Sequence, residues 1–171
     1  MKKILKNIGL VVVCGMMMLN SEAQTIDPHT KYVMVIHGGA GTIEKKYMTP
    51  QKEKAYRDAL TKALEHGYKM IDEGYPAMDA VQAAVNVMED SPLFNAGKGA
   101  VFTHEGKNEL DASIMDGATL KAGAVAGITT IRNPINAARA VMEKSEHVMM
   151  VGQGADLFAQ QNGCDTVSPA Y

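Results

Sequence analysis

Residues 121–151 read KAGAVAGITTIRNPINAARAVMEKSEHVMMV, and no other stretch of the chain says as much about its fold. The run at 121–132 is apolar and rich in glycine and alanine, which is typical of a strand packed close to another backbone. Asn133 and Pro134 then predict a helix start, because asparagine caps helices well and proline fits their first turn. Residues 147–151 predict a second strand, so the stretch alternates strand, helix and strand.

Further predicted elements lie on both sides of this stretch. Before it, ELDASIMDG (109–117) follows AVFT (100–103) and a polar turn, which predicts a β-hairpin around Gly106. After it, residues 154–161 predict a helix that Gly163 ends.

The N-terminal part of the chain predicts one strand and two helices. Residues 31–37 (KYVMVIH) are a compact apolar run before glycines, which predicts a buried strand. Thr49 and Pro50 predict the start of a helix that ends near Gly74, and Pro76 starts the next one. Apolar residues of this second helix recur at three- and four-residue steps. They predict a buried stripe of Met78, Val81, Val85 and Met88. Many short strands, with a hairpin before helices, favour an α+β layered fold over a doubly wound parallel one.

The composition is that of an ordinary globular domain. Of the 171 residues, 46% are apolar and 21% are charged, and the formal net charge is −2. This charge and the lack of a basic run argue against a nucleic-acid partner. No linker, repeat or low-complexity segment divides residues 24–171, which we treat as one domain.

The first residues predict an export signal rather than part of the fold. Three lysines precede an apolar run at 8–19, and the small residues Ser21 and Ala23 occupy the two positions that a signal peptidase reads. We therefore predict a cleaved signal peptide over residues 1–23 and a periplasmic or secreted protein. A signal anchor and a buried N-terminal helix are the alternatives, although the run is short for a bilayer span. Cleavage would leave Cys164 as the only cysteine, which predicts neither an intramolecular disulfide nor a cysteine metal site.

The motif HGGAG at 37–41 follows the first predicted strand. Its glycines expose backbone N–H groups that can hold an anion or a polar substrate group. An esterase with an HGG oxyanion loop would also need a G-x-S-x-G elbow, which the chain lacks. No histidine pair has metal-ligand spacing. Asp111 and Asp116 are a carboxylate pair that acid–base chemistry can use, although hydrogen bonding to turn backbone is the favoured interpretation.

Five sequence blocks follow one another along the chain. They are HGGAG (37–41), SPLFNAGKGAVF (91–102), ELDASIMDG (109–117), KAGAVAG (121–127) and RNPINAARAVMEKSEHVMMVGQGADLFA (132–159). Each block alone is weak, but all five in this order are specific. Together they resemble the plant-type L-asparaginase/isoaspartyl aminopeptidase family, also called β-aspartyl peptidases. The resemblance extends from about Val33 to Pro169.

This resemblance implies a fold and an activity. The fold is the αββα four-layer sandwich of N-terminal-nucleophile hydrolases, of which this chain would supply the N-terminal half. Family precursors cleave themselves, and the new N-terminal threonine of the β-subunit is the nucleophile. The implied reaction is hydrolysis of L-asparagine and β-aspartyl (isoaspartyl) dipeptides, with no cofactor. The implied partners are the β-subunit from the same precursor and a second αβ pair in an (αβ)2 heterotetramer.

The family nucleophile lies in a G-T-V-G-like segment that these 171 residues do not contain. We therefore expect residues 24–171 to be an α-subunit portion that lacks the nucleophile and is inactive alone. A truncated non-catalytic remnant and a glycosylasparaginase-like amidohydrolase are the alternatives. The HGGAG and FNAGKGAVF blocks favour the plant-type branch over the second of these.

The resemblance also carries over a set of site residues. Asn95 matches the family asparagine that points toward the catalytic site. His37, Gly38 and Gly39 match the loop that lies against the nucleophile. In the family, the SPLFNAGKG loop wraps a structural sodium ion (Na+) with backbone carbonyls, since a hard monovalent cation prefers neutral oxygens. A plain helix C-terminal cap is the alternative interpretation of this loop. By match, the sodium-binding carbonyls belong to Met88, Glu89, Ser91, Phe94, Ala96 and Lys98.

Overall fold

The computed structural model of the chain describes residues 32–39, 45–168 and 171. The predicted signal peptide and the last two residues of the HGGAG motif lie outside this part. Within it, no helix combines the length and the hydropathy needed to cross a membrane.

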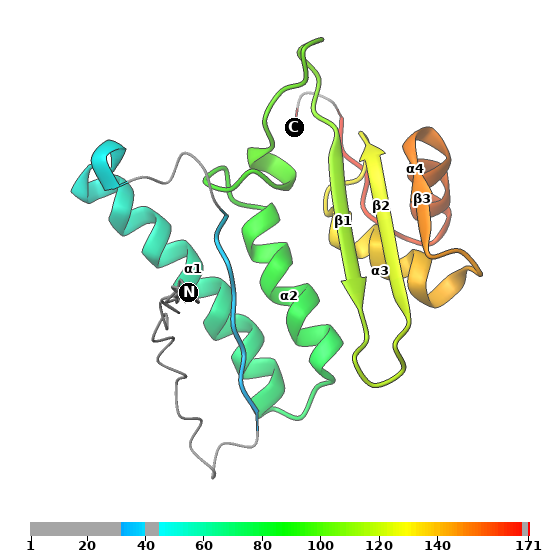
Figure 1. The fold of residues 1–171 in the computed structure, drawn as a ribbon, viewed down its shortest axis with the longest axis horizontal. Coiled ribbons are helices and arrows are strands. Elements are labelled where there is room, and N and C mark those ends of the chain that lie inside the picture. Colours follow the sequence, from blue (N-terminus) through cyan, green and yellow to red (C-terminus); the bar gives the residue numbers. More distant parts are fainter. Residues whose placement is uncertain (1–31, 40–44, 169–170) are drawn as a thin grey trace, which may run out of the picture. The chain divides into compact units, whose positions relative to one another are not determined.

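Three strands form one mixed sheet in the order β1-β2-β3 (Figure 1). β1 (Leu110–Met115) pairs antiparallel with β2 (Ala122–Ile128). β2 pairs parallel with β3 (Met149–Val151). The helix α3 (Pro134–Lys144) provides the crossover that a parallel pair needs. Strands and helices together give the predicted α+β class.

The predicted hairpin around Gly106 is wrong. The chain does turn there, because the Thr103 N–H donates to the Lys107 carbonyl at 2.7 Å. Residues 100–103 nevertheless form no strand, and the antiparallel partner of β1 is the small-residue strand that follows it. A turn alone cannot make a hairpin when the segment before it has no ladder partner.

The real hairpin turn lies at residues 116–121, where the side chain of Asp116 organises the backbone. Its carboxylate accepts hydrogen bonds from the Ala118 N–H at 3.0 Å and from the Thr119 hydroxyl at 2.5 Å. Leu120 in this turn has a φ of 60°, a left-handed conformation that residues other than glycine seldom adopt. The Asp-Gly pair that opens the turn is a known hairpin signal.

Helices α3 and α4 (Gly152–Gln161) cover one face of the sheet. An ideal Cβ on Gly123 of β2 would lie 2.2 Å from the Ala138 carbonyl oxygen of α3, so no side chain fits there. The predicted close approach of this strand to another backbone is therefore confirmed. The buried apolar core between these elements consists of Ile114, Val125, Ile128, Ile131, Ile135, Ala137, Ala138, Val141, Ala155 and Ala159.

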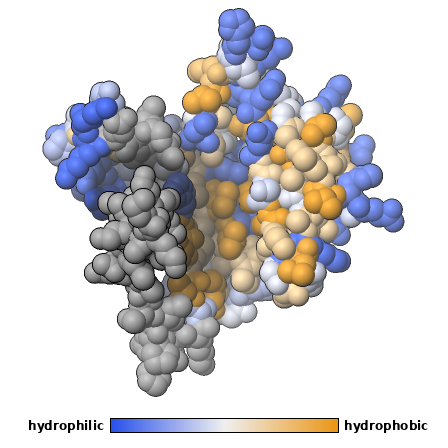
Figure 2. All heavy atoms as spheres, in the orientation of Figure 1, coloured by the Kyte–Doolittle hydropathy of each residue, from blue (hydrophilic) through white to orange (hydrophobic). Residues whose placement is uncertain are grey.

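The other face of the sheet stays open among the described residues. Met115, Met149 and Val151 project from it and are 56%, 53% and 62% exposed. Figure 2 views the molecule from this side and shows apolar residues gathered over the sheet. An apolar sheet face normally packs against a second layer, because an exposed one loses the gain from burial.

Two long helices, α1 (Pro50–Asp72) and α2 (Ala77–Glu89), pack against each other. The start of α1 is as predicted, since the Thr49 hydroxyl accepts a hydrogen bond from the Lys52 N–H at 3.1 Å. The buried stripe predicted for α2 is only partly right, because Val81 is 41% exposed. The fully buried residues at the interface are small, and they are Ala63, Gly67, Ala80 and Ala84.

Residues 32–37 lie along α1 and do not belong to the sheet. Tyr32 donates its hydroxyl hydrogen bond to Asp72 at 2.7 Å, and Met34 lies against Gly67. No strand among the described residues pairs with this segment, so the predicted buried strand is wrong for this part of the chain. Its outward side chains Val33 and Val35 are 56% and 84% exposed.

Candidate functional site

Asn95 occupies an exposed loop between α2 and β1, which we define as residues 91–101 and call the Asn95 loop. The Asn95 Oδ1 accepts a hydrogen bond from the Val101 N–H at 2.9 Å. This bond fixes which end of the side-chain amide is which, because only the oxygen can accept. Among the described residues no group accepts a hydrogen bond from Nδ2, so this donor is available to a ligand.

The Asn95 loop curls back on itself around two glycines. Gly97 has a φ of 48°, and an ideal Cβ on it would lie 2.4 Å from the Glu89 carbonyl oxygen. An ideal Cβ on Gly99 would lie 2.2 Å from the Phe94 carbonyl oxygen. Phe94 itself is buried and meets the Tyr56 ring edge to face, with the ring centroids 5.8 Å apart. The loop thus has an apolar anchor on one side and close backbone contacts on the other.

The predicted sodium-binding carbonyls belong to this curled loop and to the end of α2 before it. Three of them accept backbone hydrogen bonds at 2.8–3.1 Å, which leaves each with a second lone pair. The carbonyl oxygens of Glu89 and Phe94 lie so close to Gly97 and Gly99 that a side chain at either glycine would collide with them. Neutral carbonyl oxygens are the ligands that a hard monovalent cation prefers. The sodium site stays a prediction, with the carbonyls of Met88, Glu89, Ser91, Phe94, Ala96 and Lys98 as its ligands.

The side chain of Glu89, which the sequence does not single out, joins this loop to α3. Glu89 is only 3% exposed, and its Oε1 accepts the Ile135 N–H at 3.0 Å. It therefore caps the N-terminus of α3, where Asn133 makes no side-chain cap of its own. Burial raises the pKa of the Glu89 carboxyl to about 7, although the hydrogen bond from Ile135 opposes this shift. Among the described residues, the Oε2 of Glu89 accepts no hydrogen bond.

Asp90 makes a second connection between the loop and α3. It accepts two hydrogen bonds from the Arg132 guanidinium, from Nε at 3.1 Å and from Nη2 at 2.9 Å. The Asn133 side chain adds a third, longer bond at 3.3 Å. No local pattern reveals this connection, because its partners are more than forty residues apart.

The HGG loop lies against α1. The His37 Nδ1 accepts the Gly39 N–H at 3.1 Å, and Gly39 has a φ of 104°. Gly38 faces Leu60, whose methyl groups would lie 3.1–3.2 Å from an ideal Cβ on Gly38. No hydrogen bond among the described residues connects this loop to Asn95. The roles of His37, Gly38 and Gly39 stay predictions.

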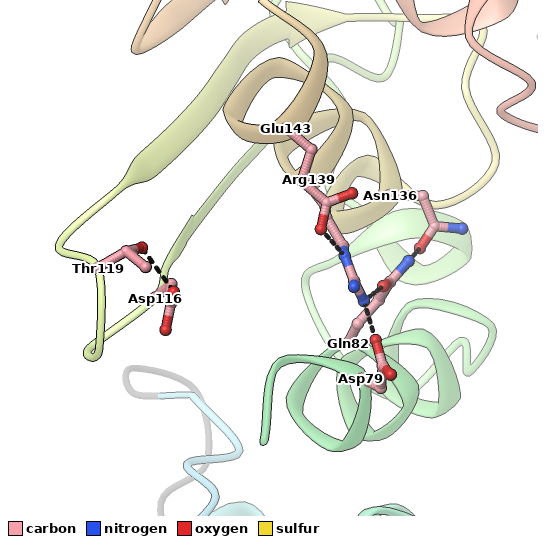
Figure 3. A network of polar contacts seen from close by, with 7 residues as sticks. All are labelled: Asp79, Gln82, Asp116, Thr119, Asn136, Arg139 and Glu143. Carbon is pink, nitrogen blue, oxygen red and sulfur yellow. Dashed lines mark hydrogen bonds and ion pairs between the residues drawn. The ribbon is translucent and has the colours of Figure 1, made fainter. Parts of the chain in front are cut away.

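Other polar groups of the chain have structural partners. Arg139 contacts Asp79 (2.5 Å) and Glu143 (2.7 Å), and it donates to the Gln82 side chain (Figure 3). Asp111 accepts the Gly127 N–H at 2.8 Å, and Asp116 holds its turn, so both acids bind backbone as the favoured interpretation had it. The part of the chain that the structure describes has no cluster of three or more histidine, cysteine, aspartate or glutamate residues that could hold a metal.

Comparisons with known proteins identify the family. The profile of the family described as asparaginase matches residues 30–171. The chain belongs to the asparaginase family. The resemblance inferred from the five sequence blocks is confirmed.

Similar proteins within the asparaginase family carry related names. The isoaspartyl peptidase of Escherichia coli K12 is 55% identical over 139 residues, which are 81% of this chain and 43% of that protein. A putative isoaspartyl peptidase/L-asparaginase of Dictyostelium discoideum is 48% identical over 141 residues, covering 82% of this chain and 41% of its own length. The plant-type L-asparaginase of Pyrococcus abyssi is 48% identical over 136 residues, covering 80% and 43%. The chain thus spans less than half the length of the relatives it matches.

Proposed function

We propose that this asparaginase-family chain is the α-subunit portion of a hydrolase for L-asparagine and β-aspartyl dipeptides. The observation that carries the proposal is the Asn95 amide, whose oxygen is bound to the Val101 N–H and whose Nδ2 remains as a donor. A donor held in a fixed direction can stabilise the oxygen that becomes negative during attack on an amide carbonyl. The names of the relatives supply the substrate class.

The nucleophile of this reaction is proposed to be a threonine outside these 171 residues, exposed by self-cleavage of a longer precursor. Its own α-amino group would take the hydroxyl proton as the threonine attacks the carbonyl of the scissile amide. The C–N bond then breaks, the leaving ammonia or amino acid takes that proton, and the aspartyl group stays on the threonine as an acyl-enzyme. Water then releases aspartate and regenerates the threonine. In this scheme the chain described above contributes Asn95, the HGG loop and the curled loop that can hold a sodium ion.

The four-layer sandwich and the β-subunit are part of the same proposal. The open sheet face with Met115, Met149 and Val151 favours them, because a second sheet would bury these side chains. Residues 32–37 favour them too, since this extended segment has exposed valines and no strand partner among the described residues. The (αβ)2 assembly, and export through a cleaved signal peptide at residues 1–23, remain proposals drawn from the family and from the sequence.

A hybrid precursor tests the proposal. It joins residues 24–171 to the part of the E. coli isoaspartyl peptidase that lies beyond the matched region. We expect two bands on a denaturing gel after maturation, ammonia release from L-asparagine, and leucine release from β-aspartyl-leucine. The E. coli protein is the positive control and residues 24–171 alone are the negative control. A soluble, folded hybrid that stays uncleaved and inactive would contradict the proposal.

A further inference from the structure

The Asn95 loop is attached to the core at its first residues. Glu89 and Asp90 end α2 and immediately precede the loop, and each binds the start of α3 through its side chain. Gly97 then brings the loop back onto Glu89. The loop therefore follows two residues whose side chains bind α3 and the two residues before it, and it returns to one of them, Glu89.

Arg132 is the side chain that fixes the direction of this attachment. Its guanidinium fork holds Asp90 through two parallel bonds of 3.1 and 2.9 Å. Together with Gly97 and Lys98 of the loop, it also lines a cavity of about 360 Å³. Arg132 thus binds the residue just before the loop and lines the same cavity as two residues of its returning part. Its own backbone N–H is bound to the Asp165 carbonyl at 2.9 Å.

The Arg132–Asp90 pair should matter more for the geometry of the loop than for the stability of the protein. The side chains of Arg132 and Asp90 are each 39% exposed, and pairs that are this accessible to water add little to stability. A bidentate guanidinium–carboxylate pair, in contrast, is strongly directional. Its loss should therefore alter the geometry of the loop more than the melting temperature of the protein.

We infer that Arg132 is a positioning residue that acts through Asp90 and the Asn95 loop to hold the Asn95 amide in its reactive direction. The statement that Asn95 acts in catalysis rests on the proposed function, whereas the attachment of the loop does not. It requires no contact between Arg132 and the substrate. Lysine cannot replace arginine at this position, because a single ammonium group does not form the fork.

Kinetics of the hybrid precursor test the inference, with Arg139→Ala on α3, the helix that follows Arg132, as the matched control. We expect Arg132→Ala and Arg132→Lys to lower kcat roughly 10-fold, with KM unchanged and a melting temperature within a few degrees of the parent. We expect Arg139→Ala to lower the melting temperature and leave kcat unchanged. In an Asn95→Ala background, Arg132→Ala should cause no further loss of kcat, because both changes remove the same interaction.

Hydrogen–deuterium exchange at the Val101 amide gives a readout that does not depend on activity. We expect faster exchange in Arg132→Ala than in the parent hybrid, and parent-like exchange in Arg139→Ala. An inactive parent hybrid would count against the proposed function alone, since the exchange result would still decide whether Arg132 holds the loop. Unchanged exchange at Val101 would overturn the inference. In an active hybrid, an unchanged kcat of Arg132→Ala would also overturn the inference. So would a loss of kcat that is the same in the parent and in the Asn95→Ala background.

Discussion

At the scale of single residues, Asn95 offers one hydrogen-bonding direction to a ligand, because its oxygen is already bound to Val101. Asn95→Asp keeps an oxygen for the Val101 N–H but loses the Nδ2 donor. We expect a fall in kcat of about 10²-fold, the usual cost of removing one donor to a developing oxyanion, with little change in melting temperature. Asn95→Ala removes both functions and should also loosen the loop. Steady-state kinetics of the hybrid precursor, together with thermal unfolding, measure the two effects. Full activity in Asn95→Asp would mean that the oxygen, not the donor, is what matters.

Gly39, rather than Gly38, is the HGG residue whose backbone requires glycine. Its φ of 104° is costly for any residue with a Cβ, by about 1–3 kcal/mol, although no atom of the described residues lies within 4 Å of an ideal Cβ there. Gly38→Ala would meet only the flexible side chain of Leu60. We therefore expect Gly39→Val to block self-cleavage of the hybrid precursor while Gly38→Ala still gives two bands on a denaturing gel. Equal cleavage of both variants would show that maturation does not need the observed backbone of this loop.

At the scale of elements, the cap that Glu89 provides for α3 makes stability depend on pH. Burial raises the pKa of this carboxyl in the folded chain to about 7, above its ordinary value of 4.5, so the folded state binds the proton more tightly than the unfolded state. Stability should therefore fall as the pH rises from 4.5 through 7. Glu89→Gln keeps an oxygen for the Ile135 N–H and removes the titration. We expect its melting temperature to vary less between pH 5 and pH 8 than that of the parent hybrid.

The control for this prediction is Glu143→Gln, which changes an exposed carboxylate on α3, the helix that Glu89 caps. Its pH profile should follow that of the parent. Parallel profiles for Glu89→Gln and the parent would show that the Glu89 carboxyl titrates alike in the folded and unfolded states.

Helices are the elements that sequence patterns predict best here, and the reason is that their end signals are local. The Thr49 hydroxyl caps α1 by accepting a hydrogen bond from the N–H three residues later, and Pro134 is the first residue of α3 as expected. The partner of a strand is harder to predict, because the local sequence pattern of one strand does not identify the segment that pairs with it. The chain turns around Gly106 as predicted, yet β1 pairs with the strand after it.

The candidate site was predictable only in part. Asn95 and the loop that carries it come from the family resemblance, since an exposed asparagine has no pattern of its own. The attachments of Glu89 to Ile135 and of Asp90 to Arg132 join residues that are 46 and 42 positions apart. Such pairs depend on how α2 meets α3 in space, and no spacing rule along the chain expresses this.

At the scale of the whole molecule, the open face of the sheet should make residues 24–171 self-associate when they are produced alone. Met115, Met149 and Val151 form an apolar surface there, and unpaired strand edges border it. We expect light scattering to show oligomers that Met149→Lys reduces. Leu157→Lys is the control, because Leu157 is similarly exposed (51%) but lies on α4, which covers the opposite face. A parent fragment that stays monomeric at high concentration would contradict this expectation.

The apolar core between the sheet and its two helices is built from one continuous part of the sequence. All of its members lie between Ile114 and Ala159, so its contacts close short loops of chain. Low contact order favours rapid folding, because little chain entropy is lost before the contacts form. During synthesis from the N-terminus, this frame can assemble on the ribosome as soon as α4 has emerged. Helix α3, which binds the residues before the Asn95 loop, is then already folded. Segments that are synthesised after α4 can pack against this folded part.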